Sequence, residues 1–209
     1  MAIAAAVLLV AAPPDVLAQA APVSVAPAPS TATSSRGVWV FLGGAATGLG
    51  AHELGHLLFN VVFDAEPGVK RISFKGVPFF AITHRRDLSP RREYAVSSAG
   101  LWVQHAASEW ILTHEPDLRD RDAPFRKGWL AFNTATSAVY AGAALARGGP
   151  PERDTRSMAA SRGLDERWMG ILILGPAVLD ALRYFRPGSE WATWTSRGMK
   201  VGLVLLVLK

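Results

Sequence analysis

The chain has 209 residues, half of them hydrophobic, and a formal net charge of +5. It contains no cysteine, which excludes disulfides and thiolate metal sites and leaves His, Asp, Glu and backbone oxygen as possible metal ligands. The apolar residues lie in blocks separated by short charged stretches, as is typical of small membrane proteins with several spans. The basic residues do not interleave with aromatic ones, so the positive charge favours loops facing anionic lipid and argues against a nucleic-acid partner.

The N-terminal part is expected to lie outside the folded domain. Residues 1–20 resemble a secretory signal peptide, with an apolar run at 3–12 and small residues at Ala18 and Ala20. Because no basic residue precedes the apolar run, an uncleaved N-terminal anchor is the alternative. Residues 21–36 are rich in Pro, Ala, Ser and Thr and cannot bury enough apolar surface to become ordered, which predicts a disordered linker. Residues 37–209 are predicted to form one membrane-embedded domain.

Four apolar segments are predicted to be membrane-spanning helices. A helix of about 20 residues crosses the hydrocarbon core of a bilayer. The segments are residues 37–63, 95–113, 128–146 and 168–185. The last of them is interrupted by Pro176. Residues 201–208 are too few to cross alone and are expected to lie at the membrane interface or against the bundle.

The basic segment 64–93, which follows the first span, is predicted to contain a β-hairpin. Residues 71–75 alternate polar and apolar side chains, Gly76 allows a turn, and residues 77–83 are mostly apolar and rich in β-formers. Basic loops remain cytoplasmic, so the first span is expected to enter from outside. The predicted fold class is therefore mainly α: a polytopic transmembrane helix bundle of about four spans with a short β-hairpin after the first span.

The first span contains the pattern H-E-x-x-H, formed by His52, Glu53 and His56, which are its only ionisable residues. Two histidines four residues apart on a helix project from one face and can hold one metal ion. Glu53 lies beside that face and can take a proton from water that the metal has made acidic. The pattern is typical of zinc-dependent hydrolysis of peptide bonds. Ionisable groups in a span are costly, by about 2.5–3.5 kcal/mol for an Asp on insertion scales, and a bound cation would offset the cost of this cluster.

The same helix has a stripe of residues at intervals of four, namely Gly44, Gly48, His52, His56 and Asn60. We expect the two glycines to let another helix pack closely against this one. We also expect the polar part of the stripe to face protein and not lipid.

Zinc needs a further protein ligand beyond two histidines, and Asp180 is the first candidate. It follows a long uncharged stretch, and Pro176 removes a backbone hydrogen bond one turn earlier, which favours a cavity at that depth. An ion pair of Asp180 with Arg183 is the alternative. Glu109 is the second candidate ligand, with His105 one turn before it; for these two an ordinary contact within a helix is the alternative.

The sequence AHELGH in the first span, the hairpin after it and the later GPAVLDA together resemble the site-2 protease family of intramembrane zinc metalloproteases. SAGLWVQH is similar to that family's small-residue helix, A-G-P-x-x-N, with Leu101 in place of the proline and Gln104 in place of the asparagine. In the family's second motif, approximately N-x-x-P-x-x-x-L-D-G, Pro176, Leu179 and Asp180 match in type, with a tighter spacing between Pro and Asp. Ala181 stands where glycine is expected, and the upstream asparagine is absent.

The resemblance implies that His52, His56 and Asp180 hold Zn²⁺ and that Glu53 is the general base. It implies an intramembrane endopeptidase that cuts substrate proteins in or next to their transmembrane segments, with the hairpin pairing with an unwound substrate segment. With the Ala-, Arg- and Gly-rich composition, it implies a multi-pass protein of a bacterial inner membrane. The alternatives are a catalytically inactive membrane scaffold or chaperone of the same fold and a zinc protease on the soluble side. The sequence does not indicate the substrate or the oligomeric state.

Overall fold

The computed structural model describes residues 35–74, 77–85 and 87–209. The predicted signal peptide (1–20), nearly all of the predicted linker (21–36) and the turn at Gly76 lie outside the described residues. The elements in chain order are α1 (Ser35–Val62), β1 (Pro67–Phe74), β2 (Val77–His84), α2 (Pro90–His114), the 3-10 helix η1 (Leu118–Asp120), α3 (Pro124–Ala146), α4 (Asp154–Arg162), α5 (Glu166–Phe185), α6 (Glu190–Leu205) and the 3-10 helix η2 (Leu206–Leu208).

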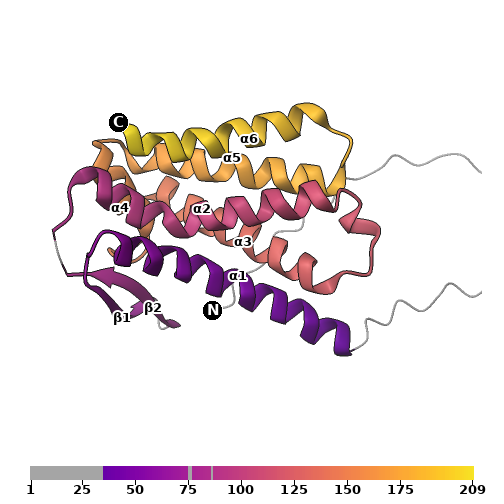
Figure 1. Ribbon diagram of the computed structural model, residues 1–209, viewed down its shortest axis with the longest axis horizontal. Coiled ribbons are helices and arrows are strands. Elements are labelled where there is room, and N and C mark those ends of the chain that lie inside the picture. The colour runs from indigo at the N-terminus through magenta and orange to yellow at the C-terminus, as the bar shows by residue number, and fades with distance from the viewer. Residues whose placement is uncertain (1–34, 75–76, 86) are drawn as a thin grey trace, which may run out of the picture. The chain divides into compact units, whose positions relative to one another are not determined.

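The prediction of a mainly helical chain with a β-hairpin after the first long helix is confirmed (Figure 1). The four segments predicted as helices correspond to α1, α2, α3 and α5. Residues 147–167, the polar segment between the third and fourth predicted spans, contain the short helix α4. The C-terminal apolar residues belong to α6 and η2, which pack against α5 and α2.

Local sequence signals account for several helix boundaries. Pro90 and Pro124 are the first residues of α2 and α3, a position where proline's missing N–H costs nothing. Asp165 caps α5 by accepting a hydrogen bond from the backbone N–H of Arg167 at 3.0 Å. Contrary to the predicted interruption, Pro176 lies inside the continuous helix α5, because one proline removes a single backbone donor and a packed helix tolerates that loss.

The helices pack in a bundle in which α1 contacts α2 and α3, and α5 contacts α3 and α6. The short helix α4 packs mainly against α2 and α5. Met158 of α4 is completely buried in the core cluster, which also contains Tyr94, Leu101, Met169 and Ile173. Full burial of such a methionine stabilises the fold by about 1.5–3 kcal/mol, so α4 is firmly attached to the bundle.

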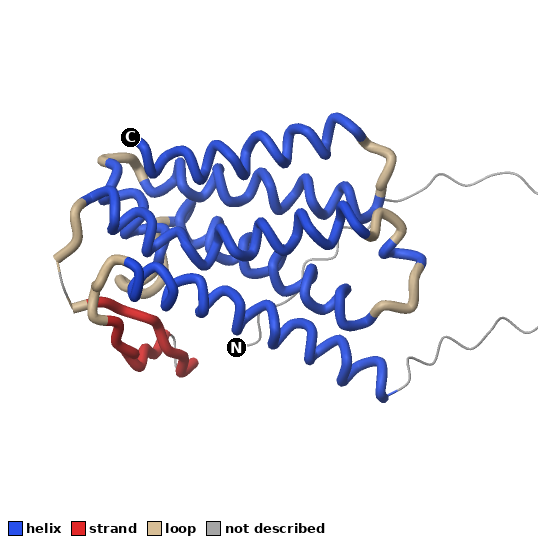
Figure 2. The backbone as a smooth tube through the Cα atoms, viewed as in Figure 1, coloured by secondary structure: helices blue, strands red, loops and turns tan. Residues whose placement is uncertain are grey.

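The hairpin is joined directly to the end of α1. Asp64 and Glu66 adopt left-handed backbone conformations (φ 52° and 54°), and the N–H of Ala65 donates to the carbonyl of Asn60 at 2.8 Å. The chain therefore turns sharply and enters β1, which pairs with β2 in antiparallel register from Pro67↔His84 to Phe74↔Val77 (Figure 2).

The predicted close packing at the glycines of α1 is confirmed, and the partner helix is α3. A Cβ atom on Gly44 would overlap the carbonyl oxygen of Phe125, and a Cβ atom on Gly128 would overlap that of Phe41. Gly48 lies against the side chain of Phe132. The backbones of α1 and α3 thus touch where glycines face each other.

Replacing Gly44 with Ala is expected to lower the free energy of unfolding by about 1–3 kcal/mol, because the added methyl group has no space. Gly43→Ala is the matched control: a Cβ atom there has nothing within 4 Å, and alanine favours a helix. Thermal unfolding of both purified variants compares them. Equal unfolding temperatures would contradict the contact.

Judged by length and composition, α5 is the one helix in the described part of the chain that qualifies to cross a membrane. The expectation of about four spans therefore remains a prediction.

Candidate metal centre

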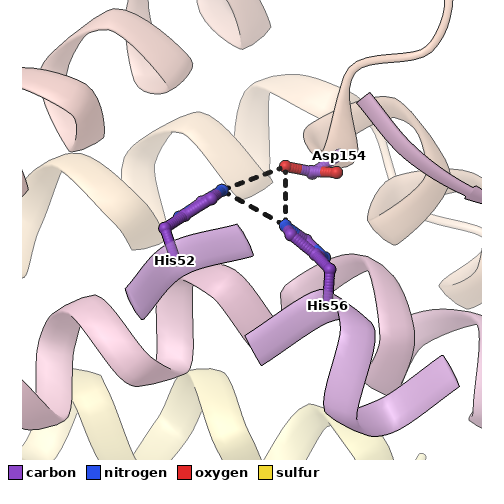
Figure 3. Close-up of side chains that lie close together, drawn as sticks. All are labelled: His52, His56 and Asp154. Carbon is purple, nitrogen blue, oxygen red and sulfur yellow. Dashed lines mark hydrogen bonds and ion pairs between the residues drawn. The ribbon is translucent and has the colours of Figure 1, made fainter. Parts of the chain in front are cut away.

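His52 and His56 lie one turn apart on α1, and Asp154, the first residue of α4, faces them (Figure 3). The Nε2 atoms of the two imidazoles are 3.2 Å apart. Asp154 Oδ2 lies 3.7 Å from His52 Nε2 and 3.4 Å from His56 Nε2. Two imidazole nitrogens and a carboxylate oxygen in this proximity could hold a metal ion.

The other nitrogen of each imidazole is hydrogen-bonded to α2. His52 Nδ1 donates to Gln104 Oε1 at 2.6 Å, and His56 Nδ1 donates to the carbonyl oxygen of Val96 at 2.8 Å. Because both partners are acceptors, each proton lies on Nδ1 and each Nε2 lone pair is left facing Asp154. Lone pairs and a carboxylate that face each other in a buried place repel one another unless a cation lies among them. The hydrogen bonds therefore select the tautomer that metal ligation requires.

The orientation of His52 is supported by a further network between α2 and α3. Asn133, which is buried, donates from Nδ2 to the carbonyl of Gln104 and to Ser108 Oγ, both at 3.0 Å. This network fixes the part of α2 that carries Gln104, and with it the ring of His52.

A glycine allows α2 to come this close to the histidines. A Cβ atom on Gly100 would lie 2.5 Å from His56 Nε2 and 2.7 Å from His52 Nε2. Any larger residue would therefore fill the space in front of the two ligand atoms. The backbone of α2 at Gly100 forms one wall of the site.

Two further polar side chains lie around the three potential ligands. Glu53 of α1 is half-buried and interacts electrostatically with both histidines and Asp154. Within the described part of the chain it has no hydrogen-bond or ion-pair partner, so it can accept a proton. The Tyr140 ring of α3 lies 5.7 Å from that of His52, and its hydroxyl interacts with the Asp154 carboxylate.

Asp154 is held in its ionised form. Partial burial raises the pKa of its carboxyl. Imidazoles that carry a second proton, on Nε2 in place of a metal ion, lower it by more through the charge of His56 and hydrogen bonds from both rings, so the pKa lies well below the usual range. Its side chain is 20% exposed, whereas those of His52 and His56 are almost entirely buried. The carboxylate thus lies at the boundary between the buried histidines and the surface.

Asp180, the predicted third ligand, does not lie at the histidines, and this prediction needs correction. Its Oδ1 accepts hydrogen bonds from Ser196 at 2.7 Å, from Lys200 at 2.9 Å and from Arg183 at 3.3 Å. A carboxylate surrounded by cationic groups is neutralised and has no reason to bind a metal ion. The alternative, an ion pair of Asp180 with Arg183, is what the structure contains.

Glu109, the second candidate, belongs to the same charge cluster. It accepts from Arg183 at 2.6 Å, from Arg197 at 2.8 Å and from Lys200 at 2.9 Å. Both candidates are therefore paired with basic residues of α5 and α6. Asp154 is the carboxylate that lies with the two histidines.

The sequence does not mark Asp154 as a candidate metal ligand, because it lies in a polar stretch with Glu152 and Arg153, where charged residues are common. No local pattern marks it, since only the folding of α4 onto α2 and α5 brings it to α1. Gly100 and Gln104 could be found from the sequence, because both lie in the small-residue segment SAGLWVQH.

Comparisons of the chain with protein-family models, with curated proteins and with solved structures find no match. Inference about its function therefore rests on the geometry of these residues.

Proposed function

We propose that the chain is a zinc-dependent endopeptidase that hydrolyses peptide bonds in or next to transmembrane segments of other proteins. The observation that carries this proposal is the convergence of two correctly oriented imidazole nitrogens with one carboxylate oxygen, beside Glu53. Histidine and carboxylate ligands suit Zn²⁺, and catalytic zinc sites use three protein ligands of this kind.

Each residue has a defined role in the proposed chemistry. His52, His56 and Asp154 would hold the ion. Bound zinc supplies a Lewis acid that makes water more acidic and polarises a peptide carbonyl. Glu53 accepts the proton of the attacking water and passes it to the leaving amine. The carbonyl of Val96 and the amide of Gln104 keep both imidazoles in the ligating orientation throughout.

The distribution of residues on α1 supports a membrane location. Its buried positions are small or polar, including Gly55 and the two histidines, whereas Leu54, Leu58 and Val61 are more than half exposed. A water-soluble helix has the opposite arrangement. A helix with an exposed apolar face and polar residues toward the protein interior is stable in a lipid bilayer.

Exposed tryptophans add support for this location. Trp39, Trp110, Trp191 and Trp194 are 72%, 50%, 63% and 67% exposed. They lie near the start of α1, the end of α2 and the start of α6, which meet at one end of the bundle (Figure 1). Tryptophan gathers at the interface between lipid and water, so this end would mark one membrane surface.

In this proposal α1, α2, α3 and α5 are the spans of a multi-pass protein of a bacterial inner membrane. The β-hairpin, which follows α1 immediately, would lie on the cytoplasmic side. Its strand edges could pair with an extended substrate segment.

Protein purified in detergent is expected to contain about one zinc ion per chain, and His56→Ala is expected to contain much less. Elemental mass spectrometry of both proteins measures this. Wild-type protein that takes up no transition metal, even after incubation with zinc, would contradict the proposal.

An alkaline wash of membranes tests the location. A zinc protease of the soluble side would be released, whereas the proposed protein stays with the lipid.

A further inference from the structure

We infer that Glu166, in the first turn of α5, positions Asp154 as a metal ligand without touching the metal site itself. This inference rests on the proposed metal site and adds to it a residue that neither the H-E-x-x-H pattern nor the ligand set contains.

The two chain neighbours of Asp154 are both bound to the Glu166 carboxylate. Arg153 donates from Nε to Oε1 and from Nη2 to Oε2, each at 2.6 Å. Thr155 Oγ1 donates to Oε1 at 2.7 Å. Asp154 is therefore held from both sides by a single side chain of a neighbouring helix.

This arrangement is well shielded from water. The side chains of Arg153 and Glu166 are each 10% exposed, and Thr155 is fully buried. A two-bond arginine–carboxylate pair has a fixed geometry, and low exposure reduces its screening by salt. Arg153 Nη1 also donates to the carbonyl of Pro150 at 3.0 Å, so the segment before α4 is held as well.

The position of Asp154 depends on such a link because α4 packs mainly on α2 and α5, whereas the histidines lie on α1. A helix of nine residues, Asp154–Arg162, has little rigidity of its own. Without Glu166, the first turn of α4 would lose three hydrogen bonds around the ligand. The carboxylate of Asp154 would then sample orientations that do not face His52 and His56.

The test is the zinc dissociation constant, measured by competition with a chromogenic chelator. Glu166→Gln is expected to weaken zinc binding by about tenfold, since residues that orient ligands contribute about 10–100-fold to affinity. Asp165→Asn is the matched control, because it changes the adjacent acid, keeps a capping side chain for α5 and does not alter the contacts of residues 153 and 155.

A second pair of proteins separates positioning from general destabilisation. In an Asp154→Ala background, Glu166→Gln is expected to cause no additional loss of zinc affinity, because the residue it positions is gone. An equal loss in both backgrounds would overturn the inference, as would wild-type affinity in Glu166→Gln. If Glu166→Gln does not fold, Thr155→Val decides, and unchanged affinity there overturns the inference. Wild-type protein without zinc affinity would instead overturn the proposed function.

Discussion

Glu53→Gln is expected to reduce peptide-bond hydrolysis by a factor of about 10²–10⁴ and to leave the zinc content unchanged. Glutamine has nearly the shape of glutamate but cannot accept a proton from water. Glu53 is not among the three groups that converge as potential ligands, so its replacement should not disturb ligation. The prediction thus separates the chemical step from metal binding.

The measurement uses single-span peptides and the purified protein in the same lipid vesicles, with products identified by mass spectrometry. Glu190→Gln, an exposed acid at the start of α6, is the control and should match the wild type. A Glu53→Gln protein that loses its zinc would show that Glu53 supports the ligands. A wild-type protein that binds zinc yet cleaves none of the peptides would favour the inactive scaffold.

Features encoded within one helix could be predicted from the sequence. The spacing of His52 and His56 places both rings on one face because an α-helix repeats every 3.6 residues. The same periodicity aligned Gly44 and Gly48, and α3 packs against them as expected. The alternation in 71–75 likewise indicated the strands. These patterns involve neighbours in the chain, so a single sequence contains them.

The identity of the third potential ligand depends on contacts between segments that are distant in the chain, and no local sequence pattern indicates such contacts. An acid in apolar surroundings appeared the better ligand, and that criterion selected Asp180. The sequence indicates Arg183 as a possible partner of Asp180, because the two lie one turn apart. It does not indicate Lys200 and Ser196, which α6 brings to the same carboxylate. Asp154 lies in a polar stretch and becomes a potential ligand only when α4 folds back toward α1.

The charge cluster of α2, α5 and α6 therefore has a structural role that differs from that of the candidate metal centre. Glu109 and Asp180 each face Arg183 and Lys200, and Arg197 completes the group. Such groups are stable in an apolar interior only when all are paired. The two sets of buried polar residues should respond oppositely when one acid is removed from each.

Asp154→Ala is expected to weaken zinc binding by more than about 100-fold, whereas Asp180→Ala is expected to leave it nearly unchanged. Removing a ligand should exceed the loss caused by removing a residue that only orients one. For stability the order reverses. Asp180→Ala deprives Lys200 and Arg183 of a buried partner and should cost about 3–5 kcal/mol. Asp154 is 20% exposed, so its removal should cost less.

Two measurements on each protein, zinc affinity and the unfolding temperature of the zinc-free form, decide between the two carboxylates. If Asp180→Ala lost zinc while its zinc-free form stayed as stable as the wild type, Asp180 would be the ligand and the convergence at Asp154 would be incidental. If Asp154→Ala lost zinc and Asp180→Ala lost stability, Asp154 would be a metal ligand and Asp180 would stabilise the fold. The second outcome follows from the contacts, because the Asp180 carboxylate is bound to Ser196, Lys200 and Arg183, whereas the Asp154 carboxylate is the one that lies at the two histidines.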